Sequence, residues 1–141
     1  MTILLATSIF SSAQDIQLAQ IAEHLYTNRI SADFDCNIST NEGDFSVRAE
    51  ILVQGDCYFA KSSGFRIFCN GNTRWTVDDS NKEVYIDKAY GLAELEEFVS
   101  SVHNLNIRKV NYLPLSDDLS AFVFDTKKLG KDWLITDLRQ E

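Results

Sequence analysis

The stretch of sequence that decides the fold is GDCYFAKSSGFRIFCNGNTRWTVDDSNKEVYID, residues 55–87. It predicts four short strands joined by three tight turns, because apolar residues recur at every second position and turn-forming residues separate the runs. Alternate side chains of a strand point to the same face of a sheet. In one common register, the residues predicted to share a face are Cys57, Phe59, Lys61, Phe65, Ile67, Cys69, Trp75, Val77, Val84 and Ile86. A broad apolar face with one cation indicates a protein that holds something apolar.

Length and charge narrow the range of functions. The chain has 141 residues, which is enough for one domain with a substantial core. Its formal net charge of −8 argues against binding along nucleic-acid phosphates and against unaided docking on an anionic membrane. Only six glycines and one proline are present, and no low-complexity tract or repeat divides the sequence. We therefore expect a single domain over residues 14–141.

The first thirteen residues, MTILLATSIFSSA, carry no charge and are mostly apolar or small. They resemble the hydrophobic core and cleavage site of a secretory signal, with Ser11 and Ala13 placed before Gln14. The positively charged start of such a signal is missing, so an ordinary amphipathic N-terminus is the alternative interpretation. We expect residues 1–13 to be the remnant of a signal peptide and the protein to be exported.

The remaining sequence predicts two helices and five further strands. The helices are expected at 15–28 and 91–104, where apolar residues follow a helical period. The strands are expected at 30–39, 45–54, 107–113, 120–126 and 132–139. The inward positions of the first two strands are Ile30, Ala32, Phe34, Cys36, Ile38, Phe45, Val47, Ala49, Ile51 and Val53. This order predicts a mainly β (α+β) protein with about nine antiparallel strands curled around an apolar face, and periodicity leaves open whether the sheet closes.

The sequence offers no recognisable catalytic set. His24 and His103 fall on different predicted helices, about eighty residues apart in the chain, whereas catalytic and metal-binding histidines need partners at short range. No nucleophile elbow, metalloprotease motif or phosphate-binding loop is present. The carboxylates are scattered over predicted turns and polar strand faces. We therefore expect no enzymatic activity, no metal and no cofactor.

Cysteine and lysine on the predicted apolar face each allow two interpretations. Cys57 and Cys69 lie on the two arms of one hairpin, where they either form a cross-strand disulfide or act as small buried hydrophobic residues; we expect the second. With Cys36 the count is odd, and the spacing does not resemble a zinc site. Lys61 either places a cation at the mouth of an apolar cavity or extends from its turn into solvent. The apolar face itself is either filled by the two helices or left partly open for a ligand.

Two segments resemble hallmarks of a known family. GDCYFAKSSGFRI (55–67) resembles a pattern in which a glycine-led strand is followed by a basic residue, a turn and an aromatic strand. NGNTRWTVDDSNKEVYI (70–86) contains an [DN]-G-x-T-x-W element, a polar turn and another strand. Both patterns are found in the outer-membrane lipoprotein carrier proteins, the LolA family, and the likeness extends over residues 15–87. The chain departs from the family by having Lys61-Ser62 where Arg-Pro is usual, and by a shorter middle segment.

The resemblance implies a fold and a function. It implies an unclosed antiparallel β-barrel, or half-barrel, whose helices act as a lid. It further implies a soluble periplasmic carrier without chemical activity, which takes acylated lipoproteins from an inner-membrane ABC-type release complex towards an acceptor at the outer membrane. The alternative is a periplasmic lipid-binding sensor or interaction domain on the same fold. The residues expected to contact acyl cargo are Phe34, Val47, Ile51, Phe59, Lys61, Phe65, Ile67, Trp75, Val77 and Ile86, together with Leu95 and Phe98 on the lid helix.

Overall fold

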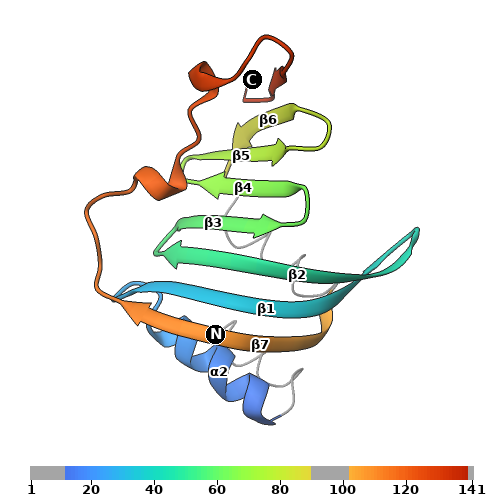
Figure 1. Cartoon of the computed structure of the whole chain (residues 1–141). Helices are drawn as coiled ribbons and strands as arrows, with labels where there is room; N and C mark the ends of the chain where they lie inside the picture. Colours follow the sequence, from blue (N-terminus) through green and yellow to red (C-terminus); the bar gives the residue numbers. More distant parts are fainter. Residues whose placement is uncertain (1–11, 90–101, 140–141) are drawn as a thin grey trace.

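One eight-stranded sheet forms the body of the protein in the computed structural model, which describes residues 12–89 and 102–139 (Figure 1). Its strand order is β7-β1-β2-β3-β4-β5-β6-β8, so β7 and β8 are its two edges and it does not close into a barrel. The elements are α2 (Ser12–Glu23), β1 (Arg29–Thr40), β2 (Gly43–Gln54), β3 (Cys57–Ser62), β4 (Phe65–Cys69), β5 (Thr73–Asp78), β6 (Glu83–Lys88), β7 (Val102–Leu113), η1 (Ser120–Phe122), η2 (Thr126–Lys128) and β8 (Leu134–Asp137).

The first six predicted strands are confirmed, and the later ones need correction. The sheet has eight described strands rather than nine, and β8 pairs with β6 in parallel, so the sheet is mixed. The predicted strand at 120–126 is wrong, because η1 and η2 are short 3₁₀ turns. Asp118 and Asp125 explain them: each side chain accepts a hydrogen bond from a backbone N–H two residues later, which turns the chain instead of extending it.

The two predicted helices have different outcomes. The N-terminal one is α2, which ends at Glu23, so the last part of the predicted range 15–28 is a turn rather than helix. The predicted lid helix at 91–104 falls mostly on residues 90–101, outside the described residues, and positions 102–104 belong to β7. Pro114 follows the last residue of β7, as expected for a residue that cannot donate to a sheet ladder.

The prediction of one common apolar face is wrong, because three of the turns differ in length from what that register requires. One is the turn after Cys69, which lies opposite Arg74, so Trp75 is on the other face. Gln54 pairs with Cys57 across a two-residue turn, so Cys57 shares the face of Gln54 and not that of Val53. Ser62 pairs with Phe65 across a second such turn, which reverses the face again. Gly55 and Gly64 have φ values of 58° and 80°, a conformation that two-residue hairpin turns favour and that glycine adopts without steric cost.

The sheet therefore has two apolar areas on opposite sides, which we name by one residue each. The Ile51 face carries the inward residues of β1 and β2 and continues onto β3 and β4 through Ala60 and Ile67. The Phe59 face is polar on β1 and β2 and becomes apolar on β3 to β6, where Phe59, Phe68, Trp75 and Ile86 form one cross-strand row.

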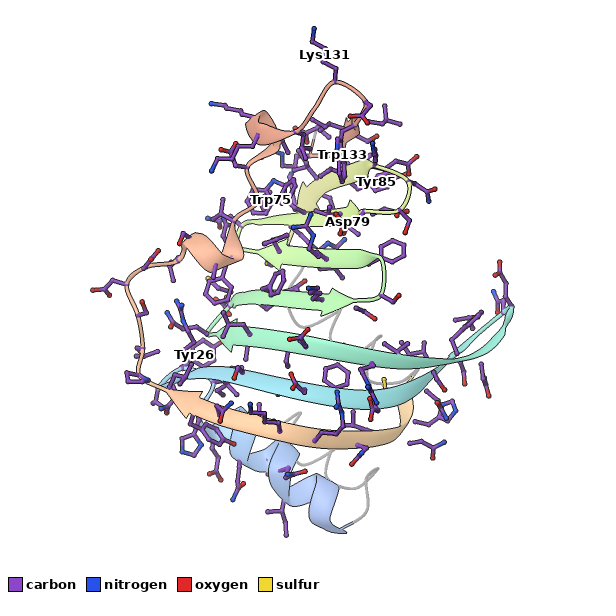
Figure 2. All side chains as sticks on the ribbon, in the orientation of Figure 1. Tyr26, Trp75, Asp79, Tyr85, Lys131 and Trp133 are labelled. Atoms are coloured by element: carbon purple, nitrogen blue, oxygen red, sulfur yellow. The ribbon has the colours of Figure 1, made fainter. Side chains whose placement is uncertain are left out.

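The chain itself fills the apolar part of the Phe59 face. Its C-terminal segment, residues 114–138, runs from the end of β7 to the β8 edge (Figure 1). Phe124, Leu129 and Trp133 from this segment pack on a cluster formed by Phe68, Val77, Val84 and Ile86. Figure 2 shows Trp133 of the segment and Trp75 of β5 at the same end of the sheet. This packed layer is the hydrophobic core on that side of the sheet.

Two arginines hold the C-terminal segment in place. Arg29 lies over the ring of Phe122, with its guanidinium carbon 5.0 Å from the ring centroid, and donates a hydrogen bond of 2.8 Å to the carbonyl of Asp118. Arg66 lies 5.4 Å from the ring centroid of Phe124 and makes two hydrogen bonds, of 2.9 and 2.7 Å, to Asp79. Planar guanidinium groups suit such sites because they stack on rings and bind carboxylates in a bidentate way.

Helix α2 is anchored at the opposite end of the sheet, near β7. The ring of His24 contacts the ring of Tyr112 on β7, with centroids 4.9 Å apart. The turn after the helix is tied to the β2–β3 turn, where the N–H of Gly55 donates to the carbonyl of Leu25 and Tyr26 donates to Asp56, both at 2.8 Å. These contacts fix the helix relative to the strands.

A buried carboxylate organises the β5–β6 turn. Asp78 is 7% exposed and accepts hydrogen bonds from the backbone N–H groups of Ser80 and Asn81 and from the side-chain amide of Asn81. These bonds, above all those from Asn81, hold the pKa of Asp78 below its usual value.

We expect Asp78 to make the protein sensitive to acid. Because its folded-state pKa is lowered, its contribution is fully present above about pH 4 and is lost as the pH falls further. Asp118, Asp132 and Asp137 also have lowered pKa values, that of Asp137 being about 2 through its bonds with Arg139, so they add to the same slope. We expect the free energy of unfolding, measured with urea, to fall between pH 5 and pH 3 in both proteins. The fall should be smaller for Asp78→Asn than for the unmodified protein. Equal losses in the two proteins would contradict the assignment.

Candidate functional site

The Ile51 face of β1 to β4 is the candidate functional site. Along β1 and β2, every inward side chain from Ile30 to Ile38 and from Phe45 to Val53 is apolar, whereas the side chains between them on the Phe59 face are mostly charged or polar. Directly opposed residues on adjacent strands bring their Cβ atoms to about 5 Å. Ile51, Ala60 and Ile67 therefore form a continuous row across β2, β3 and β4.

Burial varies across this face. Ile30, Ala32, Cys36 and Ala49 are buried. A second group of side chains is only half-buried or is exposed, and we call it the apolar strip: Phe34, Val47, Ile51, Ala60, Phe65 and Ile67. Phe65 is 49% exposed, and so the strip offers accessible aromatic and aliphatic surface among the described residues. Contiguous accessible apolar surface of this kind is typical of ligand and partner sites.

Five of the predicted cargo residues lie on the Ile51 face, and five do not. Phe34, Val47, Ile51, Phe65 and Ile67 are in the apolar strip. The structure places Phe59, Lys61, Trp75, Val77 and Ile86 on the opposite face. Leu95 and Phe98 lie outside the described residues. The sequence pattern placed these ten residues on one face, whereas the structure divides them between the two faces of the sheet.

Lys61 is not on the apolar strip. It is exposed, and it lies directly opposite Glu50 on β2 and Arg66 on β4, on the polar part of the Phe59 face. Of the two interpretations of this residue, the structure agrees with the one in which the side chain reaches solvent. Val77 and Ile86 instead belong to the cluster on which the C-terminal segment packs, Phe59 and Trp75 pack on the same cluster, and Val77 is fully buried.

The cation that borders the apolar face is Arg74, which the sequence interpretation passed over. Cys69 on β4 is directly opposite Arg74 on β5, so this arginine lies where the Ile51 face turns polar. Its guanidinium is 2.7 Å from the carboxylate of Asp87, and both side chains are largely buried. Arg74 lies inside the Asn-Gly-Asn-Thr-Arg-Trp element. With the observed length of the turn after Cys69, the alternation of the sequence places Arg74 on the same face as Cys69.

Two hollows bordered by described residues lie on the other side of the sheet, and their linings mix charged and apolar side chains. One, of about 390 Å³, is lined by Ser31, Ala32, Asp33, Glu50, Ile51, Leu52, Phe59, Lys109 and Asn111. The second, of about 320 Å³, lies beside Asp35, whose carboxylate pairs with Arg48 at 3.0 Å and with Arg108 at 3.2 Å. Their charged linings suit an acyl chain less well than the apolar strip does.

The cysteines behave as small buried residues. Cys36, Cys57 and Cys69 are all buried and none forms a disulfide, as the expected interpretation requires. Burial raises the pKa of the Cys36 and Cys57 thiols, so these thiols stay protonated and unreactive near neutral pH. Among residues 12–89 and 102–139, no three His, Cys, Asp or Glu side chains are grouped as a metal site would require.

No protein-family model matches the chain, and no curated protein matches its sequence. Within the described part of the chain, no helix has the length and apolar character needed to cross a membrane.

Proposed function

We propose that the protein binds acyl chains on the apolar strip and carries acylated lipoproteins. In this role it is exported to the periplasm, receives cargo from an inner-membrane ABC-type release complex and delivers it to an acceptor at the outer membrane, as the resemblance to the LolA family implies. The supporting observation is the continuous apolar row on the Ile51 face, whose members are half-buried, whereas the C-terminal segment packs on the apolar part of the Phe59 face.

The shape of the row suits a linear alkyl chain. Ala60 lies between the larger Ile51 and Ile67, so the row is lowest in its middle, along β3. Each CH₂ removed from water contributes about 0.8 kcal/mol. A 16-carbon chain therefore gains on the order of 10 kcal/mol when fully covered, and roughly half of that when only one side is in contact, before the cost of ordering the chain.

Full cover requires a second surface. We propose that the sheet curls as a half-barrel around the acyl chain and that a helix within residues 91–101, with Leu95 and Phe98, acts as the lid. When no cargo is present, an apolar lid rests on the strip and already shields it from water. The net free energy gained when an acyl chain binds is therefore smaller. A carrier needs this reduction, because several fully buried acyl chains would otherwise bind too tightly to be released.

The proposal is tested by identifying what the protein carries. Protein isolated from its native periplasm should contain an acylated lipoprotein by native mass spectrometry, and the emptied protein should bind a fluorescent 16-carbon fatty-acid probe saturably. Bound fatty acid or phospholipid without lipoprotein would indicate a lipid-binding sensor instead. Absence of probe binding by folded, emptied protein would exclude an acyl site.

A further inference from the structure

The apolar row of the candidate site ends in polar groups on β5 and β6. Ile67 on β4 is directly opposite Thr76 on β5, and Thr76 is opposite Tyr85 on β6, so two hydroxyl-bearing side chains continue the row beyond Ile67. Towards its other end the row reaches Ala32 on β1 and stays apolar. An acyl chain that lies along this row therefore has its polar end at β5.

Arg74 and Asp87 lie beside that polar end. They share a face with Thr76, because Arg74 comes two residues before it on β5 and Asp87 pairs directly with Arg74. The guanidinium Nη2 of Arg74 donates a hydrogen bond of 2.7 Å to Oδ2 of Asp87. Diagonal neighbours on adjacent antiparallel strands are about 7–8 Å apart. One small head group can thus reach both the Asp87 carboxylate and the Thr76 hydroxyl.

Within the described part of the chain, one carboxylate oxygen of Asp87 has no hydrogen-bond partner. This atom, Oδ1, is buried, and buried acceptors in proteins are nearly always satisfied. The Asp87 side chain as a whole is 20% exposed, so it borders accessible space. The torsion that orients an aspartate carboxylate is broad, so Oδ1 can turn towards an arriving donor at little cost. The site thus offers an acceptor to a ligand that carries an N–H or O–H group.

We propose that Asp87 and Thr76 bind the head group of an amide-linked acyl chain, and that the site prefers this linkage to an ester or a free carboxylate. A secondary amide donates through its N–H and accepts through its C=O, which matches the Asp87 carboxylate and the Thr76 hydroxyl. An ester has a similar shape but no donor, and a free carboxylate only accepts and is repelled by Asp87. This preference rests on the proposed acyl binding and specifies the linkage of the cargo.

Two ligands that differ only at the linkage test this preference. N-Methylhexadecanamide carries an N–H where methyl hexadecanoate carries an oxygen. In displacement of a fluorescent 16-carbon fatty-acid probe, the emptied, unmodified protein should bind the amide at least tenfold more tightly, the effect of about one hydrogen bond to a charged acceptor. Equal affinities would overturn the preference and leave acyl binding in place. If neither the ligands nor the probe bound, the proposed function would fail as well.

Asp87→Asn tests the carboxylate oxygen without changing the shape of the side chain. Arg74 can only donate, so the amide oxygen of the asparagine should face Arg74 and its NH₂ group should replace Oδ1. A donor then stands where the acceptor was, and the preference for the amide ligand should fall below twofold.

Asp35→Asn is the matched control for this substitution. Asp35 also pairs with an arginine, Arg48, at 3.0 Å, but on the opposite face of the sheet, so the control should keep the preference. Circular dichroism establishes that both variants are folded. A preference that survives Asp87→Asn unchanged, or that is lost equally in Asp35→Asn, would show that Asp87 is not the acceptor.

Discussion

Phe122→Ala is expected to lower the free energy of unfolding by about 3–5 kcal/mol, the range for truncating a fully buried phenylalanine. Phe122 is 0% exposed and lies beneath the guanidinium of Arg29. It belongs to a 3₁₀ turn of three residues, which has little stability of its own, so burial of this ring supplies much of what holds the segment. Urea unfolding followed by tryptophan fluorescence measures the effect, because Trp75 and Trp133 both pack on the adjoining cluster.

The neighbouring residue provides the control. Val123 is 43% exposed, and Val123→Ala should change the free energy of unfolding by less than about 0.5 kcal/mol. If the two variants were equally stable, the C-terminal segment would not be part of the cooperative fold. The apolar part of the Phe59 face would then be accessible, and the assignment of the acyl site to the opposite face would lose its support.

Ala60→Trp is expected to weaken binding of a 16-carbon acyl probe at least tenfold. The indole would occupy the low middle of the row between Ile51 and Ile67, where we propose that the alkyl chain lies. A tenfold loss corresponds to about 1.4 kcal/mol, which is equivalent to fewer than two CH₂ groups displaced from contact. Fluorescence titration of emptied protein measures the dissociation constant.

Lys61→Ala is the matched control, because residues 60 and 61 are adjacent in sequence and point to opposite faces. It should leave probe affinity within about twofold. Since a tryptophan can disturb packing, Ile67→Ala tests the same row by removing contact, and we expect it to weaken binding by several-fold with the fold retained. If Lys61→Ala strongly weakened probe binding and the strip variants did not, the acyl site would have to lie on the Phe59 face.

Alternation of apolar and polar residues predicted strands β1 to β6 correctly but could not assign their faces. The side of the sheet to which a given side chain points depends on the number of residues in the preceding turn. One residue more or fewer in that turn moves every side chain of the strand to the opposite side of the sheet. The turns at Gly55-Asp56 and Ser63-Gly64 contain two residues each, and this length moved Phe59 and Lys61 away from Ile51 and Phe65. The segment from 114 to 138 was hardest to predict, because local Asp caps and distant arginine contacts, not periodicity, set its path.

The sequence by itself determined that the protein is mainly β, that its strands begin and end near the turn-forming residues, and that β1 and β2 each present one wholly apolar side. These properties follow from local alternation and turn chemistry. Only the tertiary structure decided which apolar residues share a face and which of the two faces the C-terminal segment packs on. That outcome depends on cross-strand register and on the C-terminal segment, which Arg29 and Arg66 hold against the Phe59 face through contacts between residues far apart in the sequence.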